Sequence, residues 1–134
     1  YRMQGSPSVS YKAVFPDVPN GYFFTSPVLW AYNNKVITGY ESGKFGPSEV
    51  ITREQMALMM YRYAKFCGLN TQNSANLNSY PDAGKVSDFS REAMSWAVGT
   101  GLIQGDQGTL NPQGSASRAH CATIIIRFIE KYDL

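Results

Sequence analysis

Histidine and cysteine are scarce in this chain, and their scarcity limits the chemistry that it can carry. Its 134 residues include one histidine, His120, and two cysteines, Cys67 and Cys121. With no second histidine and no cysteine at ligand spacing, neither a metal site nor a cofactor is expected. The cysteines fall on apolar faces of predicted helices, at non-equivalent places in the repeat described below, which favours free buried thiols over a disulfide.

Recognisable sets of catalytic residues are lacking as well. No Ser-His-Asp or Cys-His set can be assembled from the repeated positions, and no two carboxylates form a matched pair. The chain is therefore not expected to be an enzyme. The formal net charge is +2 and the basic residues are not clustered, so nothing points to a nucleic-acid partner. No apolar run approaches the length of a membrane span, and no signal peptide is visible.

What the chain does contain is an internal repeat. Residues 51–55 read Ile-Thr-Arg-Glu-Gln, and residues 116–120, which begin 65 positions later, read Ala-Ser-Arg-Ala-His. Each opens a helical pattern with the same apolar spacing. The two stripes are Met56, Met59, Met60, Tyr63 and Cys67 in the first copy and Cys121, Ile124, Ile125, Phe128 and Tyr132 in the second.

Both segments have the features of a helix N-terminus. Thr52 is a good N-cap and Gln55 stands at N3, which together make a capping box. Ser117 can cap the second helix, but His120 occupies its N3 position, so a full box is not expected there.

Arginine follows the cap in both copies, as Arg53 and Arg118. A cation is slightly unfavourable at a helix N-terminus, which suggests that each arginine serves something outside its helix. Free amides, a hydroxyl and a guanidinium together form a site for a carboxylate or phosphate. The alternative is that each arginine is solvated or pairs with an acidic neighbour. Arg53 is expected to be an exposed side chain that contributes little to stability.

The rest of the repeat predicts an all-α fold with loops. Each copy has an aromatic-Pro-Asp turn, a short helix with a Trp-Ala pair, a glycine loop and the longer helix. Ser26, followed by a proline, and Ser90 are the predicted N-caps of the short helices. Lys35 aligns with Gly101, so the first short helix is expected to end less favourably than the second. The matching segments are 15–18 and 80–83, 30–31 and 96–97, 36–39 and 102–105, and 43–47 and 108–112.

The repeat divides the chain into four segments. Residues 1–14 are interpreted as the tail of a preceding repeat, at positions 1–4, followed by a linker. The chain opens on Tyr1 and is expected to be part of a longer protein. Residues 15–67 are the first complete repeat, 68–79 an Asn- and Ser-rich linker, and 80–134 the second complete repeat.

The ordered motifs resemble those of the S-layer homology domain. They are Phe-x-Asp-Val from Phe15, Trp-Ala from Trp30, Gly-x-x-x-Gly-x-Phe-x-Pro from Gly39 and Ile-Thr-Arg-Glu from Ile51. The resemblance implies tandem helix–loop–helix repeats within a pseudo-threefold helical bundle. It also implies a non-catalytic, extracellular module that anchors a bacterial surface protein to secondary cell-wall polysaccharide, often one that carries pyruvate ketals.

The resemblance further implies two ligand sites. Thr52 and Arg53 fall in one and Ser117 and Arg118 in the other, with the arginine expected to meet the ketal carboxylate. Arg53 is ranked above Arg118 because its surroundings keep the fuller motif. The other family positions that could face a sugar are Glu54, Asp17, Asp82, Trp30, Trp96, Gly39 and Gly105.

Each of these further positions has a structural alternative. A tryptophan beside an alanine on a short amphipathic helix is commonly core, the aspartates suit turn capping, and the glycines suit tight turns. In the second copy, Leu110 replaces the aromatic Phe45, and the motif reads Ser-Arg-Ala-His, with His120 at the fourth place where the family prefers an acid or amide. These changes lower the affinity expected of that site.

Two functions stay open at this point. The first is a carbohydrate-binding anchor. The second is a protein–protein assembly module that keeps the fold but has lost glycan binding. With one repeat missing, an uncovered apolar face is expected to favour self-association or docking of the third repeat.

Overall fold

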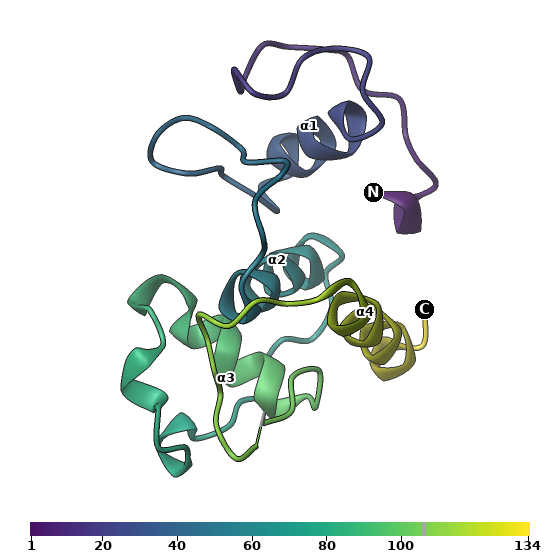
Figure 1. The fold of residues 1–134 in the computed structure, drawn as a ribbon. Helices are drawn as coiled ribbons and strands as arrows, with labels where there is room; N and C mark the ends of the chain where they lie inside the picture. The colour runs from purple at the N-terminus through teal and green to yellow at the C-terminus, as the bar shows by residue number, and fades with distance from the viewer. Residues whose placement is uncertain (106) are drawn as a thin grey trace. The chain divides into compact units, whose positions relative to one another are not determined.

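The computed structural model describes residues 1–105 and 107–134, and these residues are helical with connecting loops (Figure 1). The described residues contain no named strand, only an isolated antiparallel bridge between Thr52 and Ser115. The all-α prediction is therefore confirmed. The α-helices are α1 (Thr25–Asn33), α2 (Arg53–Phe66), α3 (Arg91–Gly99) and α4 (Arg118–Tyr132). The 3₁₀ turns are η1 (Arg2–Gln4), η2 (Leu77–Ser79), η3 (Ala83–Lys85) and η4 (Asp88–Ser90).

The chain forms two compact units, residues 1–49 and residues 50–134. The division falls inside the first sequence repeat, between its glycine loop and its long helix. Unit 1 therefore holds η1, α1 and the loops around them, whereas unit 2 holds α2 together with the whole second repeat. A sequence repeat is thus not a packing unit in this protein.

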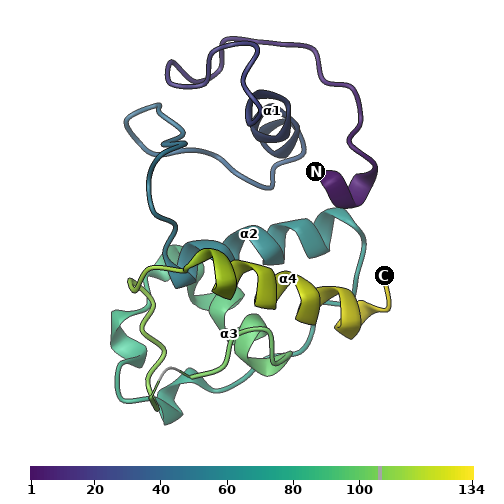
Figure 2. The same ribbon diagram turned by 45° about the vertical axis from the view of Figure 1, so that its right-hand side comes forward.

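Unit 2 is built around α2, which packs against α3 and α4. In both views α2 and α4 lie side by side (Figures 1 and 2). The core is aromatic at its centre: the rings of Trp96 and Tyr61 are 5.3 Å apart, and that of Phe128 is 5.7 Å from Tyr63. The buried side chains of the three helices include Met56, Ala57, Met60, Ala64, Ala93, Met94, Ala97 and Ile124. The predicted apolar stripes supply part of this core: Met56, Met60, Tyr63, Ile124 and Phe128 are buried, and the other five stripe residues are half-buried.

The caps of the long helices follow the sequence prediction. The Gln55 amide donates to the Thr52 hydroxyl at 3.2 Å, and the Thr52 amide donates to the Gln55 side chain at 2.9 Å. This is the reciprocal capping box that was expected. At α4 the Ser117 hydroxyl accepts from the His120 backbone amide at 3.1 Å. Ser117 therefore caps the helix without the reciprocal bond from the N-cap amide to the N3 side chain that completes a capping box.

For the short helices, the predicted N-cap position is wrong at Ser26 and right at Ser90. Helix α1 begins at Thr25, so Ser26 lies inside its first turn, and the Thr25 hydroxyl accepts from the Tyr22 amide instead. Ser90 does stand at the N-cap of α3, but it makes no side-chain capping bond. Its hydroxyl instead donates to the Glu54 carboxylate at 2.8 Å.

Unit 1 is organised around the ring of Phe15, which is buried. Its neighbours are Tyr32, 5.4 Å away between ring centres, and Phe45, 5.8 Å away. Beyond the C-terminus of α1, Lys35 has a φ of +62°, where Gly101 in the second repeat has +80°. Helix α1 therefore ends on a strained non-glycine residue, as the alignment predicted.

Candidate ligand-binding site

The start of α2 is held by the segment that leads into α4. The Arg53 amide donates to Gly114 O at 2.9 Å, and the Glu54 amide donates to Pro112 O at 3.0 Å. In return, the Ala116 amide donates to Ile51 O at 2.8 Å. The two Thr/Ser-Arg motifs are therefore adjacent in space, and the first amides of α2 are already used by protein carbonyls.

The Arg53 side chain is buried, with only 7% of its surface exposed. Its Nε donates to Leu110 O at 2.9 Å and its Nη2 donates to Gln104 O, also at 2.9 Å. Both acceptors lie in the glycine loop of the second repeat. The expectation of an exposed arginine is therefore wrong, because the guanidinium is buried and joins α2 to that loop.

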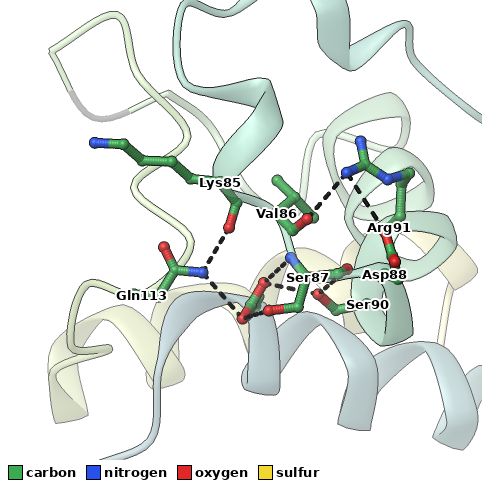
Figure 3. A network of polar contacts seen from close by, with 8 residues as sticks. Lys85, Val86, Ser87, Asp88, Ser90, Arg91 and Gln113 are labelled. Atoms are coloured by element: carbon green, nitrogen blue, oxygen red, sulfur yellow. Dashed lines mark hydrogen bonds and ion pairs between the residues drawn. The ribbon is translucent and has the colours of Figure 1, made fainter.

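Glu54 is also buried, and its carboxylate is the centre of a polar network; its partners Ser87, Ser90 and Gln113 are labelled in Figure 3. It accepts from the Ser87 amide at 2.9 Å, the Ser87 hydroxyl at 2.7 Å, the Ser90 hydroxyl at 2.8 Å and the Gln113 amide group at 3.2 Å. Burial by itself would raise the pKa of Glu54, but these donors outweigh it and hold the pKa below its ordinary value. Glu54 is placed to join α2 to the second repeat.

Asp17, a predicted ligand residue, binds the glycine loop of its own repeat. Its two carboxylate oxygens accept from the backbone amides of Phe45, at 2.9 Å, and Gly46, at 2.7 Å. The Phe45 amide is the main cause that lowers the pKa of Asp17.

Asp82 makes the same contacts one repeat later. It accepts from the amides of Leu110, at 2.9 Å, and Asn111, at 2.8 Å. The Leu110 amide is the main cause that lowers its pKa. Both aspartates therefore clamp a loop, which is the structural alternative that the sequence offered for them.

The two predicted tryptophans are core residues. Trp30 is 8% exposed and Trp96 is 1% exposed. The indole N–H of Trp96 donates to the Tyr132 hydroxyl at 3.1 Å, so its polar atom is satisfied inside the protein.

The two predicted glycines lie against the aromatic residue that opens each repeat. A Cβ on Gly39, whose φ is +83°, would lie 2.5 Å from the ring of Phe15. A Cβ on Gly105 would lie 3.3 Å from the ring of Tyr80. Close packing on these rings accounts for glycine at both positions.

The start of α4 is exposed to solvent, whereas the start of α2 is covered by other parts of the protein. Ser117 and Arg118 are exposed. Within the part of the chain that the structure describes, the Arg118 guanidinium has no hydrogen-bond or ion-pair partner, and neither have the backbone amides of Arg118 and Ala119. Of the predicted ligand residues, Ser117 and Arg118 alone combine a capping hydroxyl, unused amides and an unpaired cation.

The sequence did not reveal Ser87, Ser90 and Gln113 as partners of Glu54. Ser87 and Ser90 are polar residues in a loop, and the first repeat has no matching pair, so nothing in the sequence marked them as partners of a residue more than 30 positions away. A buried carboxylate requires donors, but only the structure shows that Glu54 is buried.

A separate surface cavity of about 540 Å³ lies near the C-terminal half of α2. Trp96 is the only predicted ligand residue in its lining. Two of its polar side chains are hydrogen-bonded within the protein: the Tyr61 hydroxyl donates to Glu92 at 2.8 Å, and Arg91 donates to Val86 O at 3.0 Å. The lining comprises Tyr61, Lys65, Thr71, Gln72, Asn73, Ser74, Asp88, Arg91, Glu92, Ser95 and Trp96.

Cys67 and Cys121 are half-buried thiols rather than fully buried ones, and residues 1–105 and 107–134 contain no disulfide. In the same residues, no three His, Cys, Asp or Glu side chains are grouped so that they could hold a metal ion. None of the described helices has the length and apolarity needed to span a bilayer.

The fold and site thus define a tandem all-α repeat in which an aspartate clamps each glycine loop, and the loop of the second repeat receives an arginine from the start of a long helix. The family model of the S-layer homology domain matches residues 14–57 and 79–122. The chain belongs to the S-layer homology domain family.

Similar proteins include surface proteins and enzymes. The chain is 28% identical over 123 residues to exoglucanase XynX of Acetivibrio thermocellus, 27% over 122 residues to S-layer protein EA1 of Bacillus anthracis, and 34% over 99 residues to the cellulosome-anchoring protein of Acetivibrio thermocellus. The matches cover 91%, 90% and 71% of this chain, but only 11%, 14% and 21% of those relatives. The family and its S-layer relatives make this a cell-surface-associated module.

Proposed function

We propose that the chain is a non-catalytic module that anchors a surface protein to an acidic secondary cell-wall polysaccharide. The relatives support the anchoring role, because an exoglucanase, an S-layer protein and a cellulosome-anchoring protein share this region although their names describe different activities. These names share no single reaction, which supports an anchoring role for the region that the proteins have in common.

The single observation that carries the acidic ligand is the geometry of Arg118. Its guanidinium is exposed and has no partner among the described residues, at a helix start where two backbone amides are also unused. A carboxylate such as that of a pyruvate ketal matches both the charge and the donors. Arg53 has two of its N–H groups committed to protein carbonyls, so the geometry supports Arg118 as the leading ligand contact.

Calorimetric titration of a purified pyruvylated wall fragment into the chain tests this proposal. Arg118→Ala is expected to weaken binding roughly tenfold to a hundredfold, because a hydrogen bond to a charged group is lost. Arg118→Lys is expected to recover part of that loss, since an ammonium lacks the planar fork. Arg2→Ala, which changes another exposed arginine, is the matched control.

Binding to wall sacculi before and after removal of the non-peptidoglycan polymer separates the two functions that the sequence left open. Loss of binding on removal supports the glycan anchor. Equal binding to both preparations, with no heat in the titration, would favour a protein–protein assembly module instead.

A further inference from the structure

Asparagine is followed by glycine at a single place in the chain, Asn20-Gly21, in the loop that leads into α1. An asparagine is chemically unstable where the next backbone nitrogen reaches the carbonyl carbon of its side chain. A following glycine obstructs this approach least, because it has no Cβ. The pair is therefore the place in the chain where a spontaneous reaction of the main chain is most favoured.

The structure leaves the reacting groups of this pair unconstrained. Asn20 and Gly21 are both exposed, and a Cβ built on Gly21 meets no atom within 4 Å. Among the described residues, the Asn20 side chain has no hydrogen-bond partner and the Gly21 amide has no acceptor. The nitrogen that would react thus gives up no hydrogen bond of the fold when it does so.

The second repeat differs at the matching positions, which hold Lys85 and Val86. There both amides are used by the 3₁₀ turn η3 (Ala83–Lys85): the Lys85 amide donates to Asp82 O at 2.9 Å, and the Val86 amide donates to Ala83 O at 3.2 Å. Unit 2 therefore has neither the reactive pair nor the free amide at this place, and the reaction is confined to unit 1.

The pair lies inside a loop that Thr25, the first residue of α1, holds closed. The Thr25 side chain is buried, and its hydroxyl donates to Pro19 O at 2.6 Å and accepts from the Tyr22 amide at 3.0 Å. One of these bonds is made before the pair and the other after it. An additional main-chain atom between residues 19 and 22 would lengthen or break one of them.

We propose that Asn20 is a site of spontaneous deamidation, which converts it to aspartate and isoaspartate and loosens the start of α1. The Gly21 nitrogen forms a bond to Cγ of Asn20, the Cγ–Nδ2 bond breaks, and the nitrogen's proton leaves with the departing ammonia. Water then opens the resulting succinimide ring at either of its two carbonyls. Water is consumed, ammonia is released, and nothing is oxidised or reduced.

The two products differ in the length of the main chain. Opening at the carbonyl that came from the side chain gives aspartate, with an unchanged backbone and one new negative charge. Opening at the main-chain carbonyl gives isoaspartate, whose backbone runs through the former side chain and is one methylene longer. Only isoaspartate therefore disturbs the loop that Thr25 closes. The reaction does not depend on polysaccharide binding.

Peptide mass spectrometry of the wild type after prolonged incubation near neutral pH tests the proposal. Chymotrypsin cleavage after Tyr11 and Tyr22 releases residues 12–22, in which Asn20 is the only asparagine. Residues 67–89 contain several asparagines but no Asn-Gly pair, and their peptides are the reference within the same sample. Peptide 12–22 is expected to gain the mass difference between asparagine and aspartate first, as two separable products. A peptide 12–22 that keeps its mass, or that reacts after the reference, would overturn the proposal.

Gly21→Ala and Gly43→Ala separate this reaction from any general effect of a substitution in unit 1. Both glycines have positive φ, +92° and +83°, and a Cβ on either meets no atom within 4 Å, so the two alanines carry similar backbone strain. Gly21→Ala places a Cβ beside the attacking nitrogen and is expected to lose the mass gain at Asn20. Gly43→Ala is expected to keep it. Equal mass gain in the two variants would contradict the mechanism.

Asn20→Asp tests the effect on α1, because it supplies the new charge without the longer backbone. Incubated wild type that is rich in isoaspartate is expected to melt at a lower temperature than Asn20→Asp, which should melt close to fresh wild type. Incubated protein that melts together with Asn20→Asp would show that the start of α1 is not loosened.

Discussion

The Nε of Arg53 donates to the Leu110 carbonyl at 2.9 Å, across 57 positions of the sequence. Arg53 belongs to the first sequence repeat and Leu110 to the second, so the bond joins the two repeats within one compact unit. An arginine at a motif associated with ligand binding therefore has a structural task, and its substitution tests fold and binding together.

Arg53→Ala is expected to destabilise unit 2 by about 2–3 kcal/mol, because two buried carbonyls lose a charged donor. Arg118→Ala removes the same side chain from the same helix position, but from an exposed site, and is expected to stay within about 0.5 kcal/mol of the wild type. Chemical denaturation of the two variants measures the difference. Equal stability of both variants would show that the bonds of Arg53 add nothing to the fold.

Glu54→Gln is expected to cost about 1–3 kcal/mol, since the amide group places a donor against hydroxyl and amide donors that require an acceptor. Glu130→Gln makes the same change on the exposed surface of α4 and is the control. Thermal melts followed by circular dichroism compare them. A Glu54→Gln melt that matches the Glu130→Gln melt would contradict the proposed role of the network.

Acid is expected to destabilise the protein through Asp17, Asp82 and Glu54, whose pKa values are all lowered in the folded state. A carboxyl with a depressed folded pKa contributes stability above its unfolded pKa, roughly 4, and loses that contribution as the pH falls through the folded value. Melting temperature should therefore drop below about pH 4. Glu54→Gln should show a smaller acid-dependent drop than the wild type; an identical drop would remove Glu54 from this account.

Gly39→Ala and Gly43→Ala separate steric overlap from backbone strain. Both glycines have a φ of +83°, but a Cβ at Gly43 meets no atom within 4 Å, whereas one at Gly39 meets the Phe15 ring. Gly43→Ala is expected to cost about 1–2 kcal/mol from the left-handed backbone alone. Gly39→Ala should cost a further 1–3 kcal/mol or so from overpacking. Denaturation midpoints measure both, and equal costs would show that Phe15 moves aside freely.

The sequence by itself determined the elements and their order. Helix periodicity, the Thr52 capping box and the internal repeat are local features, because they depend on residues within a few positions of one another or on direct comparison of two segments. The strained end of α1 at Lys35 also followed from the alignment with Gly101. The repeat also indicated the family, since the ordered motifs recur in both copies.

Only the tertiary structure decided which motif residues are available to a ligand. Arg53 and Arg118 look alike in sequence, and the fuller motif favoured Arg53. Their difference lies in what packs on each helix start: the second-repeat loop brings the carbonyls of Gln104 and Leu110 to Arg53, while the described residues bring none to Arg118. Exposure depends on contacts between segments more than 50 positions apart, and local sequence rules cannot supply such contacts.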